Sequence, residues 1–453
     1  MPAPRPDRLH LDTSYRQIFR LALPIMAGSA AQNAIALTDS VFLYHLSVDD
    51  FAAIGFVSVF YLIVAAIGYG FSKAGQVLIA RRAGQGDTVG LRQSFQAMFV
   101  FELLLAAGAF LFMTYGAYWL FALLVDSDVI FSRSLEYLAP RKWGVFASYA
   151  GIAFVALYSG IGRTSSLLFA TGVLLACNIA LDYALIFGHW GAPAMGIAGA
   201  GLASTVSEYV ALLTFLGYVV LDRPVRAMHL LRFAPVDWAL MRTQAKLSLP
   251  VVAQSVVGLG SYLFFFGIVE NLGERALAIT NLVRVVYLAL SVPAWGFATA
   301  VNTLTSHFLG RGRRRAVLPL TYKTAWVCLW TTLALSIPVA IAPRAVLYPL
   351  FGSEQVDLVE GARPVFFVLV SILSLFAYGT TFFNSLVGAG AVWYALRIQT
   401  AAALIYMALV YAVIQTGVGG IAGAWSVELV YWAMLWWLGA RGLAEGRWQG
   451  ARL

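Results

Sequence analysis

The sequence has 453 residues, of which 61% are aliphatic, aromatic or cysteine and only 11% are charged. Soluble globular domains carry about 25% charged residues, so this composition excludes a water-soluble protein. The formal net charge is +9, but the basic residues lie in short segments between long apolar runs. That distribution indicates membrane topology, and we expect no nucleic acid among the partners.

Twelve apolar runs follow one another along the chain, and each is longer than the about 20 residues that cross a bilayer as a helix. A backbone inside a bilayer must satisfy its own hydrogen bonds, which favours helices. We therefore predict an all-α integral membrane protein. Its 12 transmembrane helices are expected at 17–45, 51–80, 92–116, 135–160, 164–188, 196–221, 246–270, 276–306, 317–343, 363–388, 393–416 and 420–444.

The basic residues between these runs alternate from one side of the membrane to the other. Of the 30 Lys and Arg, 21 fall on the side of the N-terminus and six on the opposite side, where Arg133, Arg141 and Lys142 are counted. Lys and Arg accumulate on the cytoplasmic side of membrane proteins. We therefore expect a multi-pass protein of the inner (plasma) membrane with both termini in the cytoplasm.

The first run contains a proline and an acid. Pro24 removes one helical hydrogen bond and clashes with the preceding turn, so we predict a hinge at or near this residue. Asp39 lies deeper in the same run. A charged side chain within a bilayer is costly and usually functional, which marks Asp39 and also Glu102 of the third run as candidates.

Further polar residues lie in the fifth and sixth runs. Asp182 and Asn178 are four residues apart and share a helix face. Asp39 and Asp182 each lie six residues before the outer end of their run, about 9 Å deep, and Ser204 lies about 12 Å deep. We predict that these four residues form a site that couples transport to H⁺ or Na⁺. The alternative is a hydrogen-bonded network that only joins helices.

The chain repeats itself at an offset of 226 residues. Glycines and prolines recur in the same order, with Pro24 matched to Pro250 and Gly86 to Gly312. Later, GIAGA occurs at 196–200 and again at 420–424. Six helices per repeat give both halves the same orientation, so we predict two six-helix lobes related by a parallel pseudo-two-fold axis along the membrane normal.

The expected domains are an N-lobe of residues 1–221, a cytoplasmic linker of residues 222–245 and a C-lobe of residues 246–453. Glu428 occupies, through the GIAGA repeat, the position that Ser204 has in the first half. It is the best acid for a second site in the C-lobe. Glu208 lies one turn from Ser204 and, with Glu102, is a candidate for the transport pathway.

Several segments resemble one family of membrane transporters. They are LALPIMAGSAAQNAIALTDSVFLYHLS in the first run, LIARRAGQGD after the second, GIGRTSSLLFATGVLLACNIALDYALIFG in the fifth and GIAGAGLAST in the sixth. Together they resemble the multidrug and toxic compound extrusion (MATE) family. The family usually has threonine at the position of Ser204, so this chain departs from the pattern but keeps a hydroxyl oxygen.

The pattern is closer to the DinF-like branch of that family than to the NorM-like branch. NorM-like members carry an acid in the seventh helix, where this sequence has Gly258. The predicted tenth helix, 363–388, also contains no acid.

The resemblance implies a secondary active efflux transporter that works by alternating access. It would export small amphipathic or cationic organic compounds in exchange for H⁺ or Na⁺. We expect a monomer surrounded by membrane lipid, with no cofactor and no metal beyond that sodium ion. The sequence has no Walker A motif, so ATP is not expected to drive transport directly.

Two other functions are weighed against this one. A lipid-linked sugar flippase of the same superfamily would usually have more helices and a strongly cationic cavity, whereas here the acids within the runs outnumber the bases. A membrane-embedded enzyme would need a nucleophile–base pair or a metal cluster within the runs. The sequence offers neither, so we do not expect an enzyme.

Overall fold

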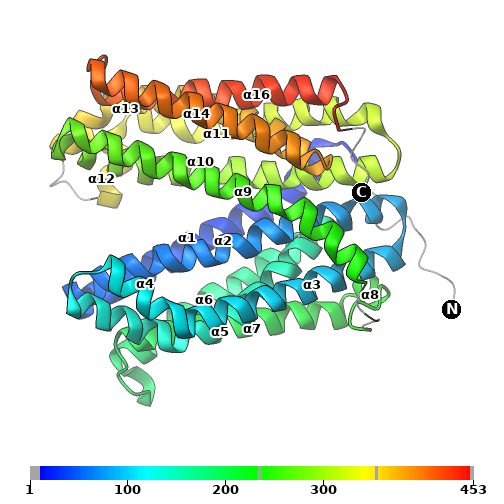
Figure 1. The fold of residues 1–453 in the computed structure, drawn as a ribbon, viewed down its shortest axis with the longest axis horizontal. Coiled ribbons are helices and arrows are strands. Elements are labelled where there is room, and N and C mark those ends of the chain that lie inside the picture. Colours follow the sequence, from blue (N-terminus) through cyan, green and yellow to red (C-terminus); the bar gives the residue numbers. More distant parts are fainter. Residues whose placement is uncertain (1–10, 233–234, 236, 352–355, 449–453) are drawn as a thin grey trace. The chain divides into compact units, whose positions relative to one another are not determined.

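The structure, a computed structural model, describes residues 11–232, 235, 237–351 and 356–448 (Figure 1). Within these residues the secondary structure is helical, and 12 helices are long and apolar enough to cross a membrane. The predicted all-α membrane fold with 12 spans is confirmed.

The first half of the chain forms six of these spans. The long helices are connected by short turns, and the third span passes through a five-residue π-helical turn at Phe112–Gly116. The helices are α1 (Tyr15–Leu46), α2 (Val48–Gln85), α3 (Thr88–Leu111) continued by α4 (Ala117–Leu124), α5 (Asp128–Gly160), α6 (Ser165–Phe187) and α7 (Ile197–Leu221), followed by the short α8 (Arg223–Arg226).

The second half repeats this order. Its last span is divided, because one residue, Val427, separates the end of α15 from the start of α16. The helices are α9 (Trp238–Val269), α10 (Glu274–Gly310), α11 (Val317–Ile341), α12 (Pro343–Phe351), α13 (Val356–Gly388), α14 (Val392–Thr416), α15 (Gly420–Ser426) and α16 (Glu428–Ala444).

Several helices are longer than the apolar runs that predicted them. α5 begins at Asp128, seven residues before the expected 135, and Ser127 caps it by accepting a hydrogen bond from the backbone of Ile130 at 3.4 Å. α9 begins at Trp238, within the linker expected at 222–245. A charged residue such as Arg133 ends an apolar run but need not end a helix. Hydropathy predicts only the part of a helix that lies in the bilayer, whereas the position of a helix end depends on capping residues. The expected cytoplasmic ends, residues 1–10 and 449–453, lie outside the described residues.

The chain forms two compact units whose bounds differ from the expected lobes. One unit contains Ala27–Leu249, and the other contains Leu11–Met26 and the chain from Pro250 onward. The division within α1 falls two residues after Pro24, and the division within α9 falls at the matching Pro250. Each helix therefore changes unit beside its proline.

The first turns of α1 pack inside the second unit. The ring centroids of Phe19 and Phe297 are 5.6 Å apart, and a Cβ on Gly296 would lie 2.4 Å from Cγ of Met26. The first turns of α9 pack inside the first unit in the same way. There the hydroxyl of Ser248 donates to the backbone carbonyl of Phe71 at 3.1 Å.

Glycines with positive φ fall at matching places in the two halves. Such a backbone conformation is easy for glycine and costly for other residues, so these positions fix the alignment of the repeats. The pairs are Gly86 (φ 74°) with Gly312 (72°), Gly162 (73°) with Gly390 (88°), and Gly196 (57°) with Gly420 (54°). The repeat seen in the sequence therefore corresponds to turns at equivalent places in the two halves. The axis that relates the halves stays a prediction.

The first unit is built around α5, which packs against α2, α3 and α7. α7 approaches α5 closely at Gly201, where a Cβ would lie only 2.4 Å from the carbonyl oxygen of Tyr137. The hydroxyl of Thr205 bonds to the carbonyl of Pro140 at 3.1 Å. This close packing places the polar side chains of α7 against those of α5.

Candidate cation-coupling site

The four residues predicted as a coupling site come together within the first unit. Asp39 lies on α1, Asn178 and Asp182 lie on α6, and Ser204 lies on α7. All are buried, with exposed fractions of 7%, 1%, 0% and 8%. The four side chains are thus buried in the same unit, and their role in coupling stays a prediction.

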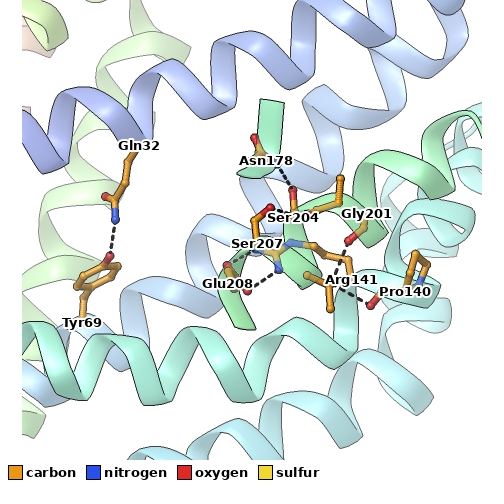
Figure 2. Close-up of polar contacts among 11 residues, drawn as sticks. Gln32, Tyr69, Pro140, Arg141, Asn178, Gly201, Ser204, Ser207 and Glu208 are labelled. Carbon is orange, nitrogen blue, oxygen red and sulfur yellow. Dashed lines mark hydrogen bonds and ion pairs between the residues drawn. The ribbon is translucent and has the colours of Figure 1, made fainter. Parts of the chain in front are cut away.

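A hydrogen bond connects α6 and α7 at this cluster. The side-chain amide of Asn178 donates to the hydroxyl of Ser204 at 3.4 Å (Figure 2). The carboxyl group of Asp39 is close enough to Asp182 and to Ser204 to interact with both. Two carboxyl groups can bond to one another only when a proton lies between them, so the Asp39–Asp182 contact needs a proton or another cation.

The protein itself supplies few donors to these oxygens. Both carboxylate oxygens of Asp182, Oδ1 of Asp39 and Oδ1 of Asn178 are buried without a hydrogen-bond donor among the described residues. Leaving such groups unpaired costs free energy, and a pair of bare carboxylates would also repel each other. These oxygens are suited to bind a proton or a hard cation, which prefers oxygen ligands.

A second polar layer lies one helical turn further along α5 and α7. The guanidinium of Arg141 binds both oxygens of Glu208, with Nη1–Oε2 and Nη2–Oε1 distances of 2.7 and 2.6 Å (Figure 2). Its Cζ also lies 3.8 Å from the ring centroid of Tyr61 on α2. Glu208, predicted as a pathway residue, is thus one half of a bidentate ion pair.

The position of Arg141 corrects one expectation from the sequence. Arg141 was counted among the basic residues outside the membrane, but it lies inside the span of α5 and is 6% exposed. The neighbouring Pro140 and Lys142 make this stretch resemble a loop. Only the contact with Glu208 on α7 shows that the charge is compensated within the protein.

Tyr137 is a site residue that the sequence reasoning missed. Its hydroxyl is close enough to interact with Ser204, Asp39, Asp182 and Arg141. Tyr137 and Arg141 are four residues apart on one face of α5, which was the signal available in the sequence.

Glu102 lies elsewhere in the first unit. It is fully buried on α3 and accepts a hydrogen bond from Ser72 on α2 at 2.7 Å. Its other oxygen faces Gly68, whose added Cβ would lie 3.2 Å away. These contacts do not involve the four-residue cluster, so a role for Glu102 in the pathway remains a prediction.

Glu428 lies in the second unit, at the first residue of α16. Its Oε1 accepts hydrogen bonds from the hydroxyl of Tyr287 and from the indole of Trp432, both at 3.0 Å. Further aromatic rings pack around these two, including Phe376, 4.5 Å from Trp432 between centroids. Glu428 is a single acid held by donors in aromatic surroundings.

No group of three or more His, Cys, Asp and Glu side chains that could hold a metal ion is found in the described part of the chain. A sodium ion would instead use the two carboxylates together with the neutral oxygens of Asn178 and Ser204.

Comparisons with known proteins agree with the resemblance seen in the sequence. The family model MatE matches residues 24–184 and again 250–412, so each match begins at one of the equivalent prolines. The chain is 27% identical to the probable multidrug resistance protein NorM of Bradyrhizobium diazoefficiens, over 68% of this chain and 66% of that protein. It is 29% identical to the protein of the same name from Agrobacterium fabrum, over 51% and 50%.

The chain thus matches between half and two thirds of the length of these relatives. The solved structure of a multidrug resistance MATE family transporter of the MOP superfamily shares the fold, with a TM-score of 0.89 over 100% of both chains and 18% identity. Neither comparison tests the DinF-like branch. Because the two family matches cover most of the chain, one in each half, the protein belongs to the MatE (multidrug and toxic compound extrusion) family.

Proposed function

We propose that this protein is a secondary active transporter that exports small amphipathic or cationic organic compounds in exchange for protons or sodium ions. Asp39, Asp182, Asn178 and Ser204 form the coupling site. The proposal places the protein in the inner (plasma) membrane as a monomer, with both termini in the cytoplasm and without a resident cofactor.

The observation that carries this proposal is the Asp39–Asp182 contact. Two buried carboxyl groups lie close together, and within the described part of the chain neither oxygen of Asp182 has a hydrogen-bond donor. A network that only joined helices would satisfy its own hydrogen bonds, because unpaired buried polar groups destabilise a protein. Buried carboxylate oxygens without protein donors are suited to bind and release a proton or a sodium ion.

Coupling follows if the incoming cation and the outgoing substrate favour different conformations. The hinge predicted at Pro24 lies 15 residues before Asp39 on the same helix. A change in the charge of Asp39 would then alter the packing of α1, which is held by both compact units. A cation can shift this equilibrium only as far as its affinities for the two conformations differ.

The second site of the proposal is Glu428, as the acid that attracts the positive centre of a substrate. Aromatic rings attract cations through their electron-rich faces, and a carboxylate adds a full charge. Tyr287 and Trp432 hold one oxygen of Glu428. The names of the relatives, multidrug resistance proteins, support organic compounds as the substrate class.

Uptake of the fluorescent organic cation ethidium into everted membrane vesicles tests this function. A sodium gradient and a proton gradient, both directed outward from the vesicle, are imposed separately. We expect accumulation with one gradient and none with Asp182→Asn, whose amide keeps the size of the carboxyl group.

The matched control is Asp49→Asn, which changes an exposed acid in the first turn of α2. Normal accumulation with folded Asp182→Asn would show that the cluster is structural. Absence of accumulation with either gradient in the unaltered protein would refute the coupled export of this class of compound. Gradient-independent movement of a lipid-linked sugar would favour the flippase.

A further inference from the structure

Burying the ion pair of Arg141 and Glu208 costs free energy of desolvation, and α5 and α7 could pack together with an apolar pair instead. Removing two charges from water is expensive, and an apolar pair of similar volume often serves packing as well. The cost is greater within a membrane. Yet α5 and α7 make room for this pair, since a Cβ on Gly144 would lie 2.5 Å from Nη1 of Arg141 and 2.9 Å from Oε2 of Glu208.

The pair lies beside the coupling site. Glu208 follows Ser204 by one helical turn on α7, and Arg141 follows Tyr137 by one turn on α5. The guanidinium of Arg141 is close enough to Asp39 for the two charges to interact. The titratable groups that interact with Arg141 come from four helices: Asp39 on α1, Tyr61 on α2, Tyr137 on α5 and Glu208 on α7. Asp182 on α6 interacts with Asp39.

Arg141 also has donors left for a second partner. A guanidinium carries five N–H donors, and Glu208 engages one on each terminal nitrogen. The oxygens of Asp182 and one oxygen of Asp39 lack donors among the described residues. One fixed positive charge therefore lies near two carboxyl groups, of which it binds Glu208 directly and acts on Asp39 from a greater distance.

We propose that Arg141 is a fixed positive charge that can compensate the negative charge of the coupling site. Glu208 and the Asp39–Asp182 pair compete for the guanidinium. While a proton or sodium ion occupies the two aspartates, Arg141 stays bound to Glu208. When that cation leaves, the field of Arg141 compensates the negative charge that remains. Arg141 and Glu208 are thus positioning residues that set the cation affinity, and this inference rests on the proposed function of the site.

Opposite effects of the two partners test this inference. Arg141→Gln removes a competing positive charge, so the cation concentration for half-maximal ethidium export should fall. Glu208→Gln releases Arg141 toward Asp39, so that concentration should rise. We expect about tenfold in each direction, the scale of interactions between nearby charges in a protein interior. The double variant should lie close to the unaltered protein.

The measurement uses the full-length protein with the cation that drives its export, varied as Na⁺ concentration or as pH. Arg133→Gln is the matched control, since Arg133 forms an ion pair with Glu136 nearer the start of the same helix and is 45% exposed. Its half-maximal concentration should not change. A purely structural bridge would lower the activity of both partner variants without opposite shifts in that concentration.

Arg141→Lys provides a second route if either glutamine variant does not fold. Lysine keeps the charge but cannot bind both oxygens of Glu208 in the fork geometry of arginine. More of its charge then acts on Asp39, and the half-maximal concentration should rise. Shifts in the same direction for Arg141→Gln and Glu208→Gln, or no shift in any variant, would overturn the inference. If export by the unaltered protein did not depend on a cation gradient, the proposed function would be overturned instead.

Discussion

The two halves of this protein have the same succession of helices but place opposite chemistry at matching positions. The offsets of 226, 228 and 224 residues between the paired left-handed glycines align the halves segment by segment. They match Asp39 with Phe265, Asp182 with Val410, Ser204 with Glu428, and Glu208 with Trp432. Where the first half carries the acids Asp39, Asp182 and Glu208, the second half carries an apolar or aromatic group, and where the second half carries Glu428 the first half has the neutral hydroxyl of Ser204.

The surroundings differ as much as the residues. In the first half, two carboxyl groups lie close together, and three of their four oxygens are buried without a donor among the residues that the structure describes. In the second half, the rings of Phe265 and Trp425 pack with centroids 5.2 Å apart, and Glu428 is held by two aromatic donors. Under the proposed function, the duplicated scaffold divides its work: the first half would bind a small inorganic cation and the second would attract an organic one.

The largest expected effect separates the two sites by a double-mutant cycle. Asp39→Asn and Asp182→Asn should each abolish gradient-driven export. The double variant should be little worse in cation binding than either single one, because both residues belong to one site. Asp182→Asn combined with Glu428→Gln should show additive losses in cation and substrate binding. The affinities of each purified variant for the cation and for the substrate are measured separately.

Strong energetic coupling between Asp182 and Glu428 in binding, without coupling between Asp39 and Asp182, would refute the division into two separate sites. The two halves would then share one site instead of dividing two tasks. Thermal melting of each variant in detergent is the control, and comparable midpoints exclude misfolding as the cause.

The next effect concerns Glu428 alone. Glu428→Gln keeps the hydrogen-bonding shape but removes the charge, so binding of ethidium should weaken by about tenfold, the scale of one charge-assisted contact. A neutral amphipathic substrate should bind nearly as before. Equal losses for cationic and neutral compounds would show that Glu428 only stabilises the packing of Tyr287 and Trp432.

Much of this architecture is predictable from the sequence, because the bilayer imposes a simple rule on length and polarity. The 12 spans and the repeat follow from apolar runs and from glycine and proline positions. The depth of Asp39, Asp182 and Ser204 follows from counting residues along helices of fixed rise. These predictions need no knowledge of which helices touch.

The unpredicted features all depend on helix contacts. Arg141 resembled a loop residue because Pro140 and Lys142 flank it, and no periodic pattern reveals that Glu208 on α7 compensates its charge. Tyr137 was missed for the same reason. The units also divide within α1 and α9, because the first turns of each helix pack with the other unit. Hydropathy carries no information about such partners.

A smaller effect is expected at the two matching prolines. Pro24→Ala restores a helical hydrogen bond, so α1 should straighten and exchange between conformations more slowly, while cation binding at Asp39 stays near normal. Spin-label distances along α1, measured from about pH 5 to about pH 8, should change in the unaltered protein and not in the variant. Constant distances in the unaltered protein while its transport varies with pH would refute the hinge. Pro250→Ala in α9 shows whether the second half needs the same freedom.

The smallest expected effect concerns how closely the helices of the first half approach. Gly201 lets α7 lie against the backbone of α5, whereas the matching residue of the second half is the large Trp425. Gly201→Ala places a methyl group 2.4 Å from the carbonyl oxygen of Tyr137, which neither backbone can avoid without moving. Overpacking of this kind costs about 1–3 kcal/mol. The melting midpoint should fall, and cation binding should weaken slightly because Ser204 moves with α7.

Gly151→Ala on α5 is the matched control, since its added Cβ meets nothing within 4 Å and alanine favours a helix. If both variants melt alike, the close approach of α5 and α7 is not what distinguishes the first half, and the charges alone must account for its cation site.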